Sequence, residues 1–306
     1  MNNQLVGLLS VLAFDLISGV SPVVTKFISF SVPSFLLVAI RFSFAAVFLF
    51  LFMLIFGKWK KSYLSITKKQ LIGLLLLGTV GSGIASWLNV VAIRQIGAAL
   101  TTILVNLEIP LGILFAVWFL GEKVTKRFLI LAVCILFGVV LVTSSGNFNI
   151  AWSMSFWIGI STSLLAAILW GACTIIGKVL LGELSSMVVA FYRFAVASVF
   201  NSLIVFILYK ENITNIISGV SMNDWLKLLY LGMGASAIAL VLYYTALKRM
   251  EVKQFSLLVT LPIAISVILG VISGERFLIH QWIGAFIIIS GIVVLVTENK
   301  KNKSLV

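Results

Sequence analysis

Hydrophobic positions along this chain form long continuous runs, with polar residues gathered in the connections between them. Each run has about the 20 residues that a helix needs to cross the hydrocarbon core of a bilayer. The two longest connections lie near residues 58–70 and 210–224, and both are polar. The pattern predicts ten transmembrane helices, over residues 4–27, 33–57, 71–93, 98–120, 127–145, 154–180, 187–209, 225–247, 254–273 and 281–297.

The composition indicates an all-α integral membrane protein. Of the 306 residues, 61% are hydrophobic and 10% are charged, whereas about half of a soluble domain is apolar. Lys and Arg number 22 against 9 Asp and Glu, a net charge of +13. In so apolar a chain, basic loops that orient helices explain this excess better than nucleic-acid binding does. We therefore expect the lipid bilayer and a small-molecule substrate as partners, and no nucleic acid.

The basic residues also predict an orientation. If the N-terminus lies in the cytoplasm, the cytoplasmic connections carry roughly three times as many Lys and Arg residues as the outer ones. This bias predicts a multi-pass protein of the plasma membrane with both termini in the cytoplasm. The first helix lacks a basic n-region and a clear cleavage site, so we expect it to be retained.

The two halves of the chain resemble each other. Gly7, Lys26 and Arg41 recur at one constant displacement, and a second set recurs with a displacement one residue longer. The pairs are Gly7 and Gly159, Lys26 and Lys178, Arg41 and Arg193, Gly121-Glu122 and Gly274-Glu275, and Gly138 and Gly291. The sequence thus predicts two five-helix repeats, residues 1–150 and 151–306. Because five spans is an odd number, the second repeat is inverted, an arrangement typical of secondary transporters.

These residues carry a family resemblance that covers nearly the whole chain. Arg41-Phe42 and Arg193-Phe194 occupy the second helix of each half, and Leu107-Glu108 and Leu261-Pro262 lead into the two Gly-Glu pairs. The chain resembles a ten-helix EamA-type member of the drug/metabolite transporter superfamily. The family typically has a proline about thirteen residues before the Gly-Glu glutamate. Pro262 fits this spacing, but in the first half Pro110 comes one residue late. The resemblance implies the fold and a transport function, and proteins of this kind export very different compounds.

Two acidic residues, Asp15 and Glu108, fall in the middle of predicted spans. Counted along their helices they lie roughly 16 Å and 15 Å from one end, near the centre of a ~30 Å hydrocarbon core. Neither is repeated in the other half, where Ala167 and Leu261 stand. Acids at this depth usually face other helices or a water-filled pathway. We interpret both as substrate-binding residues and Glu108 also as the proton-coupling candidate, beside a kink at Pro110.

Each assignment has a structural alternative. Glu108 and Asp15 would then be hydrogen-bonded or protonated carboxyl groups, and serines on its own helix (Ser10, Ser18 and Ser21) would satisfy Asp15. Arg41 is deep enough to require an acidic partner, with Asp15 or Glu108 as the mid-membrane candidates, or else it binds a substrate carboxylate. Arg193, the equivalent residue, has a structural role in this interpretation.

Neutral polar and aromatic side chains complete the predicted substrate site: Asn89, Asn106, Trp87, Trp170, Tyr243 and Tyr244. Their alternative roles are interface belts for Trp and Tyr and helix–helix hydrogen bonds for Asn. Glycine-rich runs occur at equivalent places, residues 78–83 and 232–236, where small residues let helices approach closely.

These features predict secondary active export of a small metabolite by alternating access with proton coupling, and an amino acid or related amine as the substrate follows largely from the family resemblance. The alternatives are efflux of lipophilic cationic drugs and, in a different class, an integral membrane enzyme. No His/Asp or metal-binding motif supports an enzyme, and we expect neither a cofactor nor a metal. Cys134 and Cys173 lie in apolar runs, without the spacing of a metal site. The sequence does not set the oligomeric state, and a monomer is compatible with it.

Overall fold

The fold is seen in a computed structural model, which describes residues 3–55, 66–120, 126–143, 153–249, 258 and 261–301. Within these residues the regular structure is helical and contains no strand. The first half contains α1 (Asn3–Lys26), α2 (Ser34–Ile55), α3 (Lys68–Leu76), η2 (Leu77–Ile84), α4 (Ala85–Ile96), α5 (Ala98–Val105), α6 (Glu108–Leu120) and α7 (Lys126–Thr143). The second half contains α8 (Met154–Glu183), α9 (Ser186–Tyr209), α10 (Ile213–Ser218), α11 (Met222–Leu229), η3 (Tyr230–Ile238), α12 (Ala239–Arg249), α14 (Leu261–Ile272) and α15 (Ile279–Lys301).

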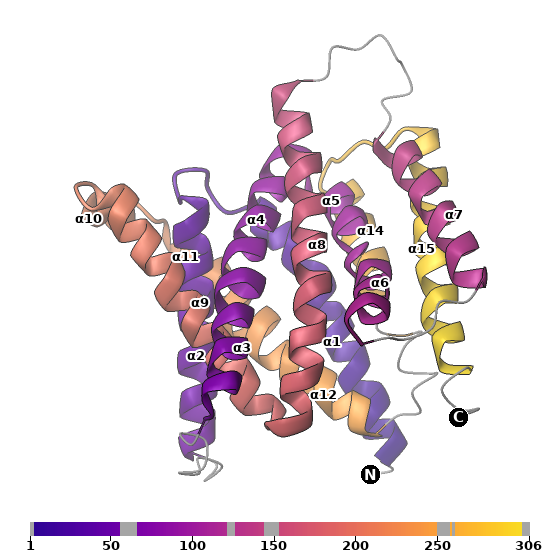
Figure 1. The fold of residues 1–306 in the computed structure, drawn as a ribbon. Coiled ribbons are helices and arrows are strands. Elements are labelled where there is room, and N and C mark those ends of the chain that lie inside the picture. Colours follow the sequence, from indigo (N-terminus) through magenta and orange to yellow (C-terminus); the bar gives the residue numbers. More distant parts are fainter. Residues whose placement is uncertain are drawn as a thin grey trace.

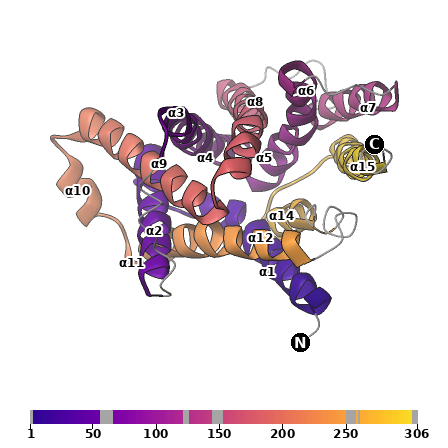
Figure 2. The same cartoon turned by 60° about the horizontal axis from the view of Figure 1, so that its bottom comes forward.

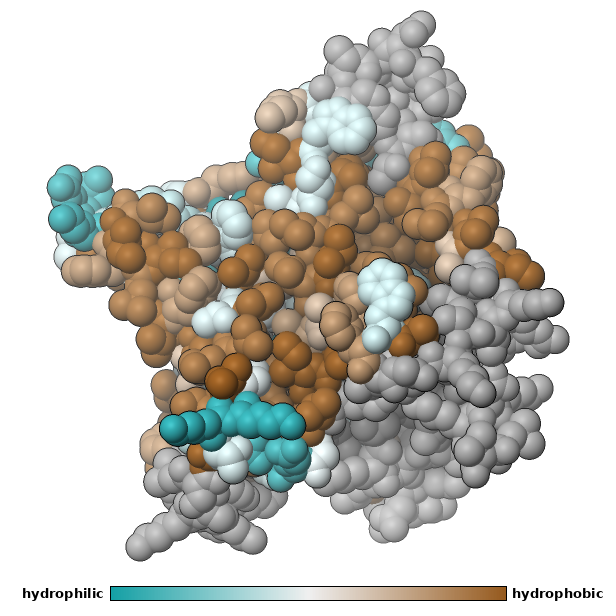
Figure 3. Space-filling model, in the orientation of Figure 1, coloured by the Kyte–Doolittle hydropathy of each residue, from teal (hydrophilic) through white to brown (hydrophobic). Residues whose placement is uncertain are grey.

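The predicted multi-pass membrane architecture is confirmed. Seven helical stretches of the described chain are long and apolar enough to cross a membrane, and three shorter apolar helices cover 130–141, 261–272 and 279–294. Large hydrophobic side chains are exposed on the outside of the bundle. Figure 3 shows them across the middle of one face, with hydrophilic side chains at its lower and upper-left ends. The exact number of ten spans stays a prediction.

The helices pack as two inverted repeats. In Figure 1, α1 begins at the lower end of the molecule, whereas its equivalent α8 begins at the upper end. The packing follows a two-fold relation: α1 packs against α12 as α8 packs against α4, and α1 against α14 as α8 against α6. Two further pairs join equivalent helices to each other, α2 with α9 and α7 with α15. Figure 2 shows α7 and α15 side by side at one edge of the bundle.

The pseudo-two-fold relation is visible in single side chains between α2 and α9. Phe42 and Phe194 are equivalent residues, and their rings stack with centroids 5.1 Å apart and planes inclined by 10°. Both rings are buried in the largest apolar core cluster. Beside them, the hydroxyl groups of Ser43 and Ser198 lie 2.5 Å apart. The inter-half interface therefore has an apolar centre flanked by polar contacts.

Two long helices contain wide, π-helical turns at equivalent places. The segment η2 interrupts the helix formed by α3 and α4, and η3 interrupts the helix formed by α11 and α12. Both contain glycines against the facing helix: a Cβ at Gly78 would lie 2.4 Å from Cβ of Val196, and one at Gly232 would lie 2.5 Å from Cβ of Phe44. The close packing expected of these glycine-rich runs is confirmed. π-Helical turns are frequent at functional sites.

The predicted kink near Pro110 is a complete interruption between α5 and α6. Pro110 has no N–H to donate to the carbonyl oxygen of Asn106, which instead accepts from Ile109 N–H at 3.1 Å. The turn falls at Asn106 and Leu107, and α6 begins at Glu108. Pro110 thus lies in the first turn of α6, where its missing donor costs little.

Candidate functional site

Glu108 lies at the helix interruption, opposite a cation from the other half. It is surrounded by protein yet keeps some exposed surface, and the backbone carbonyl beside it packs on Gly171 of α8. The guanidinium of Arg193, on α9, acts electrostatically on its carboxyl group. The two groups form no direct ion pair in the described part of the chain. An acidic group of the first half and a basic group of the second half thus lie near enough to interact electrostatically.

Arg193 is held in place by η2. Its Nε donates to Oγ of Ser82 at 2.5 Å, and a terminal nitrogen lies near Gly81. The carbonyl oxygen of Gly81 accepts from the indole Nε1 of Trp170 at 2.7 Å. The thiol of Cys173 lies beside Gly81 and experiences the charges of both Arg193 and Glu108. Among the described residues, Arg193 makes a hydrogen bond only through Nε, so its terminal amino groups can meet a carboxylate.

Arg41 makes the equivalent contact in the opposite half. Its Nε donates to Oγ of Ser236 in η3 at 2.9 Å, and its guanidinium lies 5.5 Å from the Phe42 ring centroid. It forms no ion pair within the described residues. The expectation that Arg41 would meet Asp15 or Glu108 was therefore wrong: the cation near Glu108 is Arg193. Depth along a helix gives the height of a side chain, but not the direction in which it points around the bundle.

Asp15 is almost completely buried, whereas Glu108 keeps some exposed surface. Its side chain is 1% exposed, and neither carboxylate oxygen has a hydrogen-bond partner. The serines expected to satisfy it do not do so, and Ser10 Oγ donates instead to the carbonyl oxygen of Val6. The two mid-membrane acids thus have different environments, one beside a cation and the other without any partner among the described residues.

The other predicted site residues make mostly local contacts. Trp87 stacks on Phe35 with centroids 4.4 Å apart, and Tyr243 meets Phe14 edge-on at 5.3 Å. Asn106 Nδ2 donates to the carbonyl oxygen of Thr102 at 2.7 Å. Asn89, on α4, is half-buried, and the side chain of Tyr244 lies outside the described residues. Among these, the structure places Trp170 beside the Glu108–Arg193 pair through Gly81, and a substrate-binding role for the others stays a prediction.

A second polar centre lies at the end of the bundle opposite the N-terminus, which we call the outer end. The carboxylate of Glu275 accepts from the backbone N–H groups of Ala98 and Ala99 at 2.7 Å and 2.9 Å. It also pairs with Lys26 Nζ at 2.9 Å. Gly97 permits this approach because its φ is +85° and a Cβ there would lie 2.7 Å from Cδ of Glu275. Glu275 thus caps α5 and joins it to α1 and to the end of α14.

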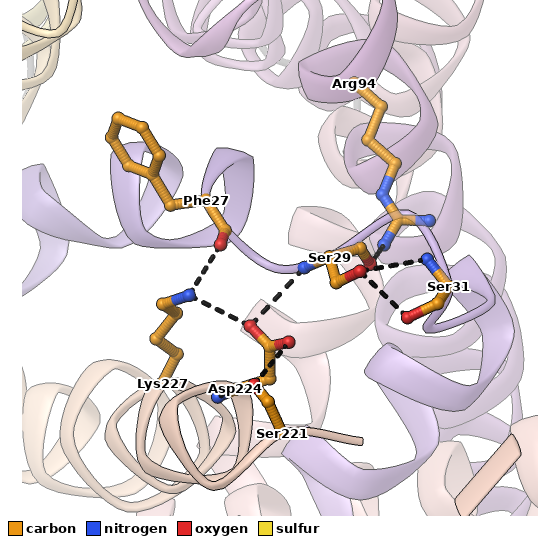
Figure 4. Close-up of polar contacts among 7 residues, drawn as sticks. All are labelled: Phe27, Ser29, Ser31, Arg94, Ser221, Asp224 and Lys227. Carbon is orange, nitrogen blue, oxygen red and sulfur yellow. Dashed lines mark hydrogen bonds and ion pairs between the residues drawn. The ribbon is translucent and has the colours of Figure 1, made fainter. Parts of the chain in front are cut away.

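Further contacts tie the α1–α2 connection to two other helices at the outer end (Figure 4). Lys227 donates to the carbonyl oxygen of Phe27 at 2.6 Å and pairs with Asp224 at 2.9 Å. Asp224 accepts from Ser29 N–H at 3.4 Å. From α4, Arg94 donates to the carbonyl oxygens of Ser29 and Val32 and to Oγ of Ser34. In this conformation the outer ends of α1, α2, α4, α5, α11 and α14 are therefore joined by polar contacts.

Ser82, Ser236 and Glu275 were not among the predicted site residues. Both serines lie in the glycine-rich runs at equivalent places of the two repeats, displaced by 154 residues, against 152 for Arg41 and Arg193. That relation was the signal that could have paired each arginine with the opposite serine. Metal binding has no candidate in the described part of the chain, where no three His, Cys, Asp or Glu side chains come together.

Comparison with known proteins gives the family. Residues 5–144 and 157–297 each match the model of the EamA-like transporter family. The chain is 27% identical over 250 residues to an uncharacterized transporter of Clostridium kluyveri, covering 80% of this chain and 78% of the relative. It is 26% identical over 307 residues to the uncharacterized transporter YetK of Bacillus subtilis, covering 98% and 90%.

A solved crystal structure has the same fold, with a TM-score of 0.64, 19% identity, and coverage of 97% of this chain and 98% of that one. The two family matches fall on the two inverted repeats seen in the structure. The chain is a multi-pass membrane transporter and belongs to the EamA-like transporter family.

Proposed function

We propose that this transporter exports a small amine-bearing metabolite, in particular an amino acid, across the plasma membrane by alternating access. The observation that carries the proposal is the pair formed by Glu108 and Arg193. A zwitterion supplies an amine for the carboxylate and a carboxylate for the guanidinium, so it satisfies both groups. Each contact would be a charge-assisted hydrogen bond, the stronger kind, in a setting with little water.

Efflux of lipophilic cations is less well supported by this pair. A permanent cation would be attracted by Glu108 but repelled by Arg193, which acts on the same carboxyl group. Exchange against protons gives export a driving force. Competition between a proton and the amine for Glu108 is the simplest form of such coupling, because a carboxyl group cannot hold both.

Alternating access requires the two repeats to rock against each other around a site between them. The helix interruption at Glu108 and the wide turns of η2 and η3 are places where such motion can be absorbed. The polar contacts of Lys26, Glu275 and Asp224 support a state in which the outer end is closed.

A screen of amino acids and their decarboxylated amines tests this function. Compounds that bind the folded protein raise its thermal midpoint, and those hits are then assayed for flux in proteoliposomes with and without a pH gradient. We expect wild type to move at least one amino acid, and Glu108→Gln, which keeps the shape of the side chain but not its charge, to move none. Transport of lipophilic cations alone, or unchanged flux in folded Glu108→Gln, would contradict the proposal.

A further inference from the structure

Asp15 is almost completely buried and has no hydrogen-bond partner among the described residues. Its side chain is 1% exposed, and both oxygens lack a hydrogen bond. An ionised carboxylate in that position would have lost its water without gaining a donor or a cation, which is strongly unfavourable. In this conformation the carboxyl group therefore holds a proton.

The contacts one helical turn on each side show what seals Asp15. Side chains four residues apart lie on the same face of a helix. Val11, one turn before, packs against Ala246 of α12, and both are 0% exposed. Gly19, one turn after, packs against Ile265 of α14, and its carbonyl oxygen accepts from Ser266 Oγ at 2.6 Å. Asp15 thus faces the joint between α1 and the helices α12 and α14.

No described cation is directed at this joint. Besides α12 and α14, α1 packs against α4, α5 and η3. Tyr230 of η3 donates its hydroxyl to the carbonyl oxygen of Ile17, and Tyr243 of α12 lies against Phe14. Arg94 of α4 is bonded at the outer end. The helices α5 and α14 carry no titratable residue. The remaining titratable residues of α12 have side chains outside the described set: Tyr244, Lys248 and Arg249.

The joint lies between the two repeats, so it must change when one repeat rocks against the other. While it is closed, Asp15 requires its proton, and once water enters, the carboxyl group can release it. Protonation and conformation are then linked, and each biases the other by the same free energy. The scaffold itself needs no acid here. The equivalent residue in α8 is Ala167, which is 0% exposed in an apolar cluster that includes Ile103 and Val267.

Glu108 has the opposite properties. It keeps some exposed surface, and the positive charge of Arg193 partly offsets the cost of burying its carboxylate, so it can bind an amine. We propose that Asp15 binds the proton that drives this transporter, while Glu108 binds the amine of the substrate. This inference rests on the proposed function and changes one part of it, because the proton is carried by a residue separate from the amine site.

Two transport assays separate these roles in the reconstituted full chain. The probes are radiolabelled leucine, phenylalanine and lysine, together with their decarboxylated amines. Exchange is measured with the same probe on both sides and no pH gradient, and uphill accumulation is measured with an acidic lumen. We expect Asp15→Asn to retain exchange within about twofold of wild type but to lose accumulation, since exchange needs no net proton movement. Glu108→Gln should lose both, and Asp15→Glu should recover accumulation.

Wild-type accumulation by Asp15→Asn would overturn the inference. So would loss of exchange in both Asp15→Asn and Asp15→Glu when both proteins remain folded, because a site for the proton alone is not needed for exchange. If Asp15→Asn does not fold, Asp15→Glu decides in its place: accumulation with a changed pH dependence supports the inference, and an unchanged pH dependence contradicts it.

Infrared spectroscopy tests the proton without any substrate. Wild type should show the carbonyl absorption of a protonated carboxylic acid that persists in mildly alkaline buffer, and Asp15→Asn should lack it. Identical absorption in the two proteins would mean that Asp15 is ionised and would refute the inference. If wild type exchanges none of the probes, the proposed function fails, and the infrared result alone decides the state of Asp15.

Discussion

Replacing Glu275 by Gln tests whether the polar contacts at the outer end hold it closed. The Glu275 carboxylate receives two backbone N–H groups and Lys26 Nζ, all within 2.9 Å. Glutamine keeps one acceptor oxygen but presents an amide NH₂ to the second N–H, so one charge-assisted bond is lost and a backbone donor of α5 is left unpaired. The ion pair adds less, because Lys26 is 25% exposed.

The expected effect can be worked from these contacts. Hydrogen bonds to charged groups contribute roughly 1.5–3 kcal/mol each, and about 2 kcal/mol is a reasonable value for the one lost here. If an open outer end makes none of these contacts, its population rises by roughly 30-fold, since 1.4 kcal/mol is a factor of about ten. The same substitution should lower the free energy of unfolding by about the same 2 kcal/mol, because the closed state that makes the contact is then the main folded state.

The native Cys173 supplies the assay. It is 5% exposed and lies beside Gly81, near Glu108 and Arg193. With Cys134 replaced by Ser, the rate at which a membrane-impermeant thiol reagent labels Cys173 from outside reports opening of the outer end. When opening is rapid, this rate follows the population of the open state. We expect Glu275→Gln to raise it by roughly 30-fold.

A matched control comes from the other end of the molecule. Glu183 accepts from Gln70 Nε2 at 2.9 Å in an exposed contact, so Glu183→Gln removes an acid without touching the outer end. It should leave labelling from outside unchanged. Equal rates in Glu275→Gln and wild type would refute the reasoning, and so would an equal increase in Glu183→Gln.

Three further predictions concern packing, the site and topology. Gly232→Ala would place a Cβ 2.6 Å from the carbonyl oxygen of Arg41 and should lower the free energy of unfolding in detergent by about 1–3 kcal/mol. A Cβ at Gly177 would meet nothing within 4 Å, so the control Gly177→Ala should raise the free energy of unfolding by less than about 1 kcal/mol. Arg193→Lys keeps the charge but loses the planar Nε donor to Ser82 and the bidentate geometry, so it should raise the KM for amino acids more than for the matching amines, and equal changes would contradict carboxylate binding. Reporter fusions after Lys69 and Lys301 should both report the cytoplasm, and an outside signal at either would overturn the predicted orientation.

The spans and the repeat were predictable because both depend on sequence position alone. Apolar length identifies a membrane helix in any packing arrangement, and Arg41 and Arg193 recur wherever the halves lie in space. The partners of these arginines were not predictable in the same way. A count along α2 gives the depth of Arg41, but whether it faces Asp15, Glu108 or Ser236 depends on helix rotation and on neighbours that are distant in sequence.

The wide turns and the cap of α5 escaped prediction for different reasons. A π-helical turn such as η2 adds a residue to one turn without changing the apolar character of the run, so hydropathy does not reveal it. The sequence does carry a signal for the cap of α5. The helix after Gly97 begins AALTTILV, with no Ser, Thr, Asp or Asn before it to receive its free N–H groups. An acid from elsewhere in the chain was needed, and Glu275 supplies it.

The distribution of charge between the halves explains how a nearly symmetric scaffold can act on an asymmetric substrate. The contacts of Arg41 with Ser236 and of Arg193 with Ser82 are equivalent, and each joins the second helix of one repeat to the wide turn of the other. These contacts can therefore persist while the repeats exchange conformations, because inversion converts one into the other. The acids obey no such relation: Glu108 and Asp15 both belong to the first repeat, and their equivalents are Leu261 and Ala167. Within the described residues, Arg193 consequently has a carboxylate near it and Arg41 has none. In the proposed mechanism the two arginines move with the repeats, and the two acids, which have no equivalents in the second repeat, determine what the protein binds.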